Sequence, residues 1–116
     1  MAAVAGGDGI VDAAKLRYRF EADVWVTGER VRLWFVSLPT EMSAEILDVV
    51  GVSLNPWGTV PVEATVDGFT WDSSMFPRKD RGCYDLPLNA KVRHRLGLRE
   101  GQRLDVTIDI DILLHL

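Results

Sequence analysis

The sequence contains a single cysteine, Cys83, so it cannot form an internal disulfide, and its two histidines lie apart from other candidate metal ligands. No apolar run reaches the roughly 18 residues that a membrane-spanning helix needs. Residues 1–8 lack the basic start and the continuous apolar core of a secretory signal. These absences predict a cytoplasmic protein without a disulfide, a metal site or a membrane-spanning segment.

Catalytic motifs are missing too. The chain has no Gly-rich phosphate loop, no dinucleotide fingerprint and no nucleophile elbow, and Ser73 and Ser74 have no His or Lys placed to act as a base. Cys83 follows basic residues that can lower a thiol pKa, but it begins a strand, where a buried and inert cysteine is usual. No two groups are spaced as an acid and a base. The sequence favours a protein without catalytic residues or cofactors over an enzyme.

The 116 residues are enough for one domain, and 47% hydrophobic and 26% charged residues are typical of a globular protein. Residues 1–14 are small and Gly-rich and show no periodicity, which predicts a flexible tail. We expect residues 15–116 to form a single domain.

Charge is distributed unevenly along the chain. Residues 41–72 contain six acids and no Lys or Arg, whereas residues 78–103 contain eight bases and three acids. The two stretches can pair with each other, within the fold or across a homodimer, or the basic one can face an anion. A mixed solvated surface is the third interpretation.

Alternating apolar residues predict strands over 16–26, 31–38, 60–66, 69–76 and 103–110. Residues 27–30 are a turn between the first two strands. Asp67-Gly68 is a strong hairpin signal, and a two-residue turn there would place Glu63 opposite Asp72. Because facing carboxylates repel, we expect a bulge that shifts the register, good solvation of both groups, or a cation beside them.

Two short helices are also predicted. Thr40 is the expected N-cap of a helix that ends near Gly51. A strand over 83–88, broken at Pro87, leads to Asn89, the expected N-cap of a second helix that Gly97 stops. This second helix should face the core with Val92 and Leu96 and solvent with its bases, Lys91, Arg93 and Arg95.

Several segments in this order resemble one family of bacterial and archaeal domains of unknown function, whose members are often paired with a YdeI/OmpD-associated helical domain. These segments are residues 18–22, 34–39, 57–62, 86–88, 92–93, 97–98 and 100–101. The resemblance implies a mainly β fold, a small double-split β-barrel of about six strands with two short helices. It implies no activity.

A second, local resemblance covers residues 86–88, 92–93, 96–98 and 101 with the strand that follows them. This stretch is similar to half of the swapped-hairpin DNA-binding motif of transition-state regulators and antitoxins. Gln102 stands where those proteins usually have an acid. The resemblance implies a dimeric, DNA-binding regulator-like domain.

A basic loop is the best candidate site. Arg78, Lys79 and Arg81 precede Gly82 and can bind phosphate or another anion, with Trp71 or Tyr84 stacking on a base or sugar. The alternative is a solvated connector in which Arg78 pairs with Asp80 or Asp85. Two functions follow from these alternatives. One is a non-enzymatic binding module for an anionic small molecule, nucleic acid or acidic protein segment, and the other is a structural protein that forms a homodimer through its apolar C-terminus.

The absence of periodicity before Lys15 generates a first prediction. Deleting residues 1–14 should shift the melting temperature by only about one or two degrees, because a tail without buried side chains contributes little to folding. Thermal unfolding followed by circular dichroism tests this, and loss of cooperative unfolding would contradict it.

Overall fold

The computed structural model of the protein describes residues 15–51 and 56–112, so the predicted tail, residues 52–55, and residues 113–116 of the apolar C-terminus proposed to form a homodimer lie outside the described residues. The described chain forms seven strands and two helices, with one helix after the third strand and one after the sixth. They are β1 (Lys15–Asp23), β2 (Trp25–Thr27), β3 (Leu33–Ser37), α1 (Thr40–Val50), β4 (Val60–Val66), β5 (Phe69–Arg78), β6 (Cys83–Pro87), α2 (Ala90–Leu96) and β7 (Arg103–Asp111).

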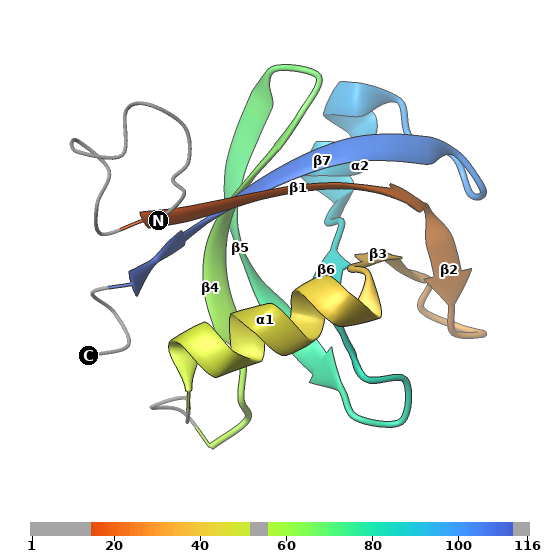
Figure 1. The fold of residues 1–116 in the computed structure, drawn as a ribbon. Helices are drawn as coiled ribbons and strands as arrows, with labels where there is room; N and C mark the ends of the chain where they lie inside the picture. The colour runs from red at the N-terminus through yellow and green to blue at the C-terminus, as the bar shows by residue number, and fades with distance from the viewer. Residues whose placement is uncertain (1–14, 52–55, 113–116) are drawn as a thin grey trace.

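The strands form one antiparallel sheet in the order β1-β7-β4-β5-β6-β3-β2. The sheet curls into a half-barrel, in which β1 and β7 cross over β4 and β5 and α1 lies in front of β4, β5 and β6 (Figure 1). The predicted mainly β fold with two short helices is confirmed. There are seven strands, one more than the approximate count expected, because one predicted strand is divided.

The predicted first strand, residues 16–26, is divided at Val24. β1 pairs with β7, whereas β2 pairs with β3 at the far edge of the sheet. Between them the N–H of Val24 donates to the carbonyl of Gln102 at 2.8 Å, and the N–H of Gly101 donates to the carbonyl of Val24 at 2.8 Å. The chain therefore changes partner at Val24, and a single continuous strand was the wrong prediction. β3 is also shorter than the predicted 31–38.

The β4–β5 hairpin turns at Asp67 and Gly68, which both have positive φ, as a two-residue hairpin turn requires. Its register runs without interruption from Val66 opposite Phe69 to Glu63 opposite Asp72 and beyond, so the predicted bulge is wrong. Both facing carboxylates are exposed to solvent, which agrees with the solvated alternative.

Helix α1 covers the inner, apolar face of the curled sheet with Ser43, Ile46 and Val50, which are all buried. The N–H of Tyr84 on β6 donates to Ser43 Oγ at 3.1 Å. The helix begins at Thr40 itself, and no side chain caps it, so the predicted Thr40 cap is wrong. Gly51 ends the helix as predicted.

Helix α2 has the predicted ends. Asn89 Oδ1 accepts from the N–H of Val92 at 3.0 Å, and Gly97 closes the helix in the left-handed conformation. The expectation that its bases only face solvent is wrong for Arg93, which donates to the carbonyl of Leu88 at 2.8 Å and whose Cζ lies 5.0 Å from the Trp34 ring centroid. Arg93 therefore helps to attach α2 to the sheet.

Alternate residues of the strands point into the curl and build the core. Leu86 on β6 and Ile108 on β7 are fully buried there, with residues such as Val36, Val60, Ala64, Met75 and Val106. Within the described ranges, no helix is long and apolar enough to cross a membrane.

The core generates a second prediction. Leu86→Ala should lower the free energy of unfolding by about 2–5 kcal/mol, because it leaves a cavity at a fully buried position. The matched Leu47→Ala, at a side chain 55% exposed on α1, should change it by about 0.5 kcal/mol or less. Urea unfolding of both variants measures this. Similar losses would show that the sheet does not enclose its core as described.

Candidate functional site

The connection between β5 and β6 is a tight turn that returns the chain onto Arg78. The N–H groups of Arg81 and Gly82 both donate to the carbonyl of Arg78, at 3.0 and 2.8 Å. Gly82 has a φ of +67°, a conformation that glycine adopts without strain and that a side chain disfavours. This turn brings Arg81 back beside Arg78, while Lys79 and Asp80 occupy its exposed tip.

Both arginines lie against one tryptophan. The Cζ atoms of Arg78 and Arg81 are 5.4 and 5.2 Å from the ring centroid of Trp25 on β2. A guanidinium at this distance from an indole is attracted by the negative potential of the ring. The ring of Phe35 lies next to Trp25, with centroids 5.0 Å apart. An edge strand therefore supplies the aromatic contact of the basic loop.

A buried carboxylate lies beneath this contact. Asp85 is 1% exposed, and its Oδ1 accepts from Ser37 Oγ at 2.6 Å. Ser37 Oγ in turn accepts from Trp25 Nε1 at 2.9 Å. The other oxygen, Oδ2, lies 3.3 Å from Arg78 Nη1 as an ion pair, and within the described chain it has no hydrogen bond. We call Trp25, Ser37, Arg78, Arg81 and Asp85 the Trp25 cluster.

Strand register explains why these side chains meet. Ser37 pairs with Asp85 across β3 and β6, and Arg78 pairs with Cys83 at the end of β5. Strand alternation puts all of them on the outer face, opposite the core. A carboxylate on the outer face of a single sheet would normally be solvated. Here Asp85 is buried, Ser37 links it to Trp25, and its charge is balanced by the Arg78 guanidinium.

The two arginines of the turn differ in their ion pairs. Arg78 also lies 3.6 Å from Asp80, so the predicted alternative in which Arg78 pairs with Asp80 or Asp85 is confirmed for both acids. In the part of the chain that the structure describes, Arg81 has no carboxylate partner, and its guanidinium lies against Trp25. Arg81 is exposed to solvent. Its charge is therefore available to a ligand.

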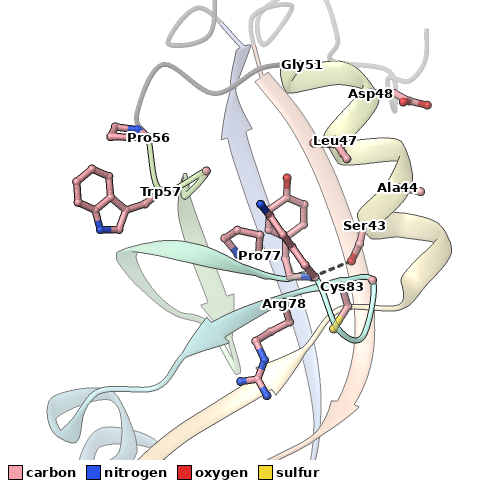
Figure 2. A pocket seen from close by; sticks show the side chains of 14 residues that line it. Ser43, Ala44, Leu47, Asp48, Gly51, Pro56, Trp57, Pro77, Arg78 and Cys83 are labelled. Atoms are coloured by element: carbon pink, nitrogen blue, oxygen red, sulfur yellow. Dashed lines mark hydrogen bonds between the residues drawn. The ribbon is translucent and has the colours of Figure 1, made fainter.

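A groove of about 720 Å³ lies between α1, the segment before β4 and the β5–β6 turn, and residues of the turn, including Arg78 and Gly82, form part of its lining. Figure 2 shows Trp57 on one side of this groove and α1 on the other, with the Arg78 side chain extending away from both. Burial raises the pKa of the Tyr84 phenol in the groove above its ordinary value. We call it the α1 groove; its lining includes Ser43, Ala44, Leu47, Trp57, Pro77, Lys79 and Tyr84.

The five predicted site residues are thus distributed over three places. Arg78 and Arg81 meet at Trp25, and Lys79 and Tyr84 line the α1 groove, to which Arg78 also contributes. Trp71 lies further back on β5, where its ring stacks on Phe69 with centroids 6.0 Å apart. Whether any of them binds a ligand stays a prediction.

Sequence reasoning missed Trp25 and Ser37 as neighbours of the basic loop. One signal was present, because Trp25 falls on the polar face of its strand, where an aromatic residue needs a contact outside the core. The contact itself depends on the pairing of β2 with β3 and of β3 with β6.

No group of three or more His, Cys, Asp or Glu side chains in residues 15–51 and 56–112 is arranged to hold a metal ion. The fold and the site together describe a small antiparallel half-barrel domain in which a basic turn lies against a tryptophan of an edge strand. Residues 20–108 match the family described as "Domain of unknown function (DUF1905)", and since this is most of the chain, the protein belongs to that family. A search of curated proteins found no match. The predicted membership of a family of unknown function is confirmed. That members of this family are often paired with a helical companion domain stays an expectation from the resemblance.

Cys83 generates a third prediction. Burial, followed by the charge of Asp85, raises the pKa of its thiol above the ordinary value, although Arg81 and Arg78 act in the opposite direction. Because the thiolate is the reactive form, iodoacetamide should modify native Cys83 much more slowly than the unfolded chain in urea at the same pH. Mass spectrometry over time measures both rates, and equal rates would show that the thiol is accessible and reactive.

Proposed function

We propose that this domain is a non-enzymatic binding module for an anionic ligand or acidic partner segment, and that Arg78 and Arg81 receive the anion. The observation that carries the proposal is that two guanidinium groups lie against one indole ring. In the described chain Arg78 has ion-pair partners, whereas Arg81 has none. Arginine suits this role because its planar fork of donors matches the oxygens of a phosphate or carboxylate.

The surroundings hold these donors in place before a ligand arrives. Asp85 engages Nη1 of Arg78 from below, and the Trp25 ring lies against both guanidinium groups. A side chain that is already fixed loses less conformational entropy on binding, which strengthens the interaction. Asp80 works against the anion, because its exposed carboxylate lies near Arg78.

The proposal retains Arg78, Lys79 and Arg81 from the predicted site and takes Trp25 as their aromatic neighbour. Tyr84 is 5% exposed on the inner face, and Trp71 packs with Phe69 elsewhere on β5. Lys79, at the tip of the same turn, adds positive potential without a fixed contact.

Arg81→Ala should weaken the binding of pyrophosphate or of a Glu-rich peptide by about tenfold or more, since a hydrogen bond to a charged group contributes about 1.5–3 kcal/mol. Asp80→Asn should strengthen binding by a fewfold, because it removes a competing carboxylate. Titration calorimetry at low salt measures both effects, and binding to the wild-type protein should weaken as salt is added.

Arg99→Ala is the matched control. Arg99 is exposed on the turn before β7, and its loss changes the net charge by the same amount while leaving the Trp25 cluster intact. Equal weakening by the two Arg variants would mean that net charge alone is responsible. No binding of either probe to the wild-type protein would refute the proposal.

A second candidate function is that of an interaction protein, including a homodimer, and the α1 groove favours it. Trp57 is 73% exposed and Leu47 is 55% exposed, and both line this groove; exposed apolar side chains that form a contiguous patch mark interaction sites. Light scattering after size-exclusion chromatography distinguishes the two forms, because a dimer built on this groove should dissociate in Trp57→Ala and remain intact in Arg81→Ala.

A DNA-binding role through α2 has less support. Arg93 is engaged by Leu88 and Trp34, and the Cζ of Arg95 lies 5.1 Å from the ring centroid of Phe69. Two bases that would approach DNA therefore already have contacts within the chain.

A further inference from the structure

An exposed phenylalanine lies directly beside the proposed anion site. Phe76 on β5 is 44% exposed, although large apolar side chains of this fold are otherwise mostly inside the curl. Arg78 follows Phe76 by two residues on β5, so strand alternation puts both side chains on the same outer face. An aromatic ring and a guanidinium therefore follow one another on a single strand.

The sheet register also places Phe76 next to a member of the Trp25 cluster. Phe76 is the cross-strand partner of Asp85, whose Oδ2 lies 3.3 Å from Arg78 Nη1. Side chains of directly paired residues begin about 5 Å apart. The Phe76 ring thus adjoins the carboxylate that holds Arg78, and it lies on the same outer face that a ligand bound to Arg78 would occupy.

We infer that the anion recognised here is the phosphate of a nucleotide, with the phosphate on Arg81 and Arg78 and the base stacked on Phe76. The inference rests on the proposed anion site and names its ligand class. Arginine forks recognise phosphate oxygens, and an exposed ring gives a base a flat apolar surface. An acidic peptide has carboxylates for the arginines but no flat group that must lie against Phe76.

This arrangement also predicts which ligands the site prefers among nucleotides, nucleosides and bare phosphates. Stacking on a ring depends on the π-face that every base has, so the site separates nucleotides from bare phosphates without distinguishing strongly between bases. The charge of the phosphate is needed as well, because the ring alone offers a nucleoside little surface.

Calorimetry with ADP, pyrophosphate and adenosine tests the inference on the full-length protein. ADP should bind roughly tenfold more tightly than pyrophosphate, which is the scale of one base stacked on an aromatic side chain, and adenosine should bind far more weakly than ADP. Phe76→Ala should remove the advantage of ADP and leave pyrophosphate unchanged. Phe76→Leu, which keeps an apolar side chain without a ring, should behave like Phe76→Ala.

The two proposals fail in different ways. If pyrophosphate and ADP bind equally, or if Phe76→Ala leaves ADP affinity unchanged, the nucleotide inference is overturned while the anion site stands. If neither binds the wild-type protein, both are overturned. If an oligo-dT strand binds much more tightly than any nucleotide at equal phosphate concentration, nucleic acid replaces the free nucleotide as ligand and the inference is again overturned. Thermal unfolding of both Phe76 variants checks that each is folded.

Discussion

The outer face of the sheet is organised around the burial of one negative charge, that of Asp85. A carboxylate removed from water needs a counter-charge and hydrogen bonds, or the fold is destabilised by several kcal/mol. Ser37 supplies the hydrogen bond and Arg78 the counter-charge, while Trp25 donates to Ser37 and lies against the Arg78 guanidinium. Contacts with Asp85 thus link the edge strand β2, the β5–β6 turn and strand β6, and they hold Arg78 of the basic turn in place.

The basic stretch of the sequence does not form one basic face, because the fold engages its members separately. Arg103 at the start of β7 pairs with Glu21 and Asp23 on β1. Arg93 attaches α2 to the sheet. Bases from one stretch of the sequence therefore make separate contacts in different parts of the fold, whereas Arg81 lies against Trp25 and is exposed to solvent.

Local patterns predicted most elements of the fold. The alternation of β7, the Asp67-Gly68 turn and the ends of α2 each depend on neighbouring residues, and all three were predicted correctly. The division at Val24 was not predictable in this way, because alternation continues through it and only the pairing partner changes. The same holds for the candidate site. The basic loop could be predicted from neighbouring residues, whereas its contact with Trp25 depends on a strand far away in the sequence.

The turn between β5 and β6 has a consequence for comparing members of this family. Arg81 reaches Trp25 because the carbonyl of Arg78 accepts two successive N–H groups and Gly82 takes a positive φ. A connection one residue longer would rotate the returning strand's first side chains by a large angle, even if every arginine were retained. Loop length and the glycine, rather than the number of basic residues, are therefore the characters that separate relatives able to form the same paired-guanidinium surface from those that are not.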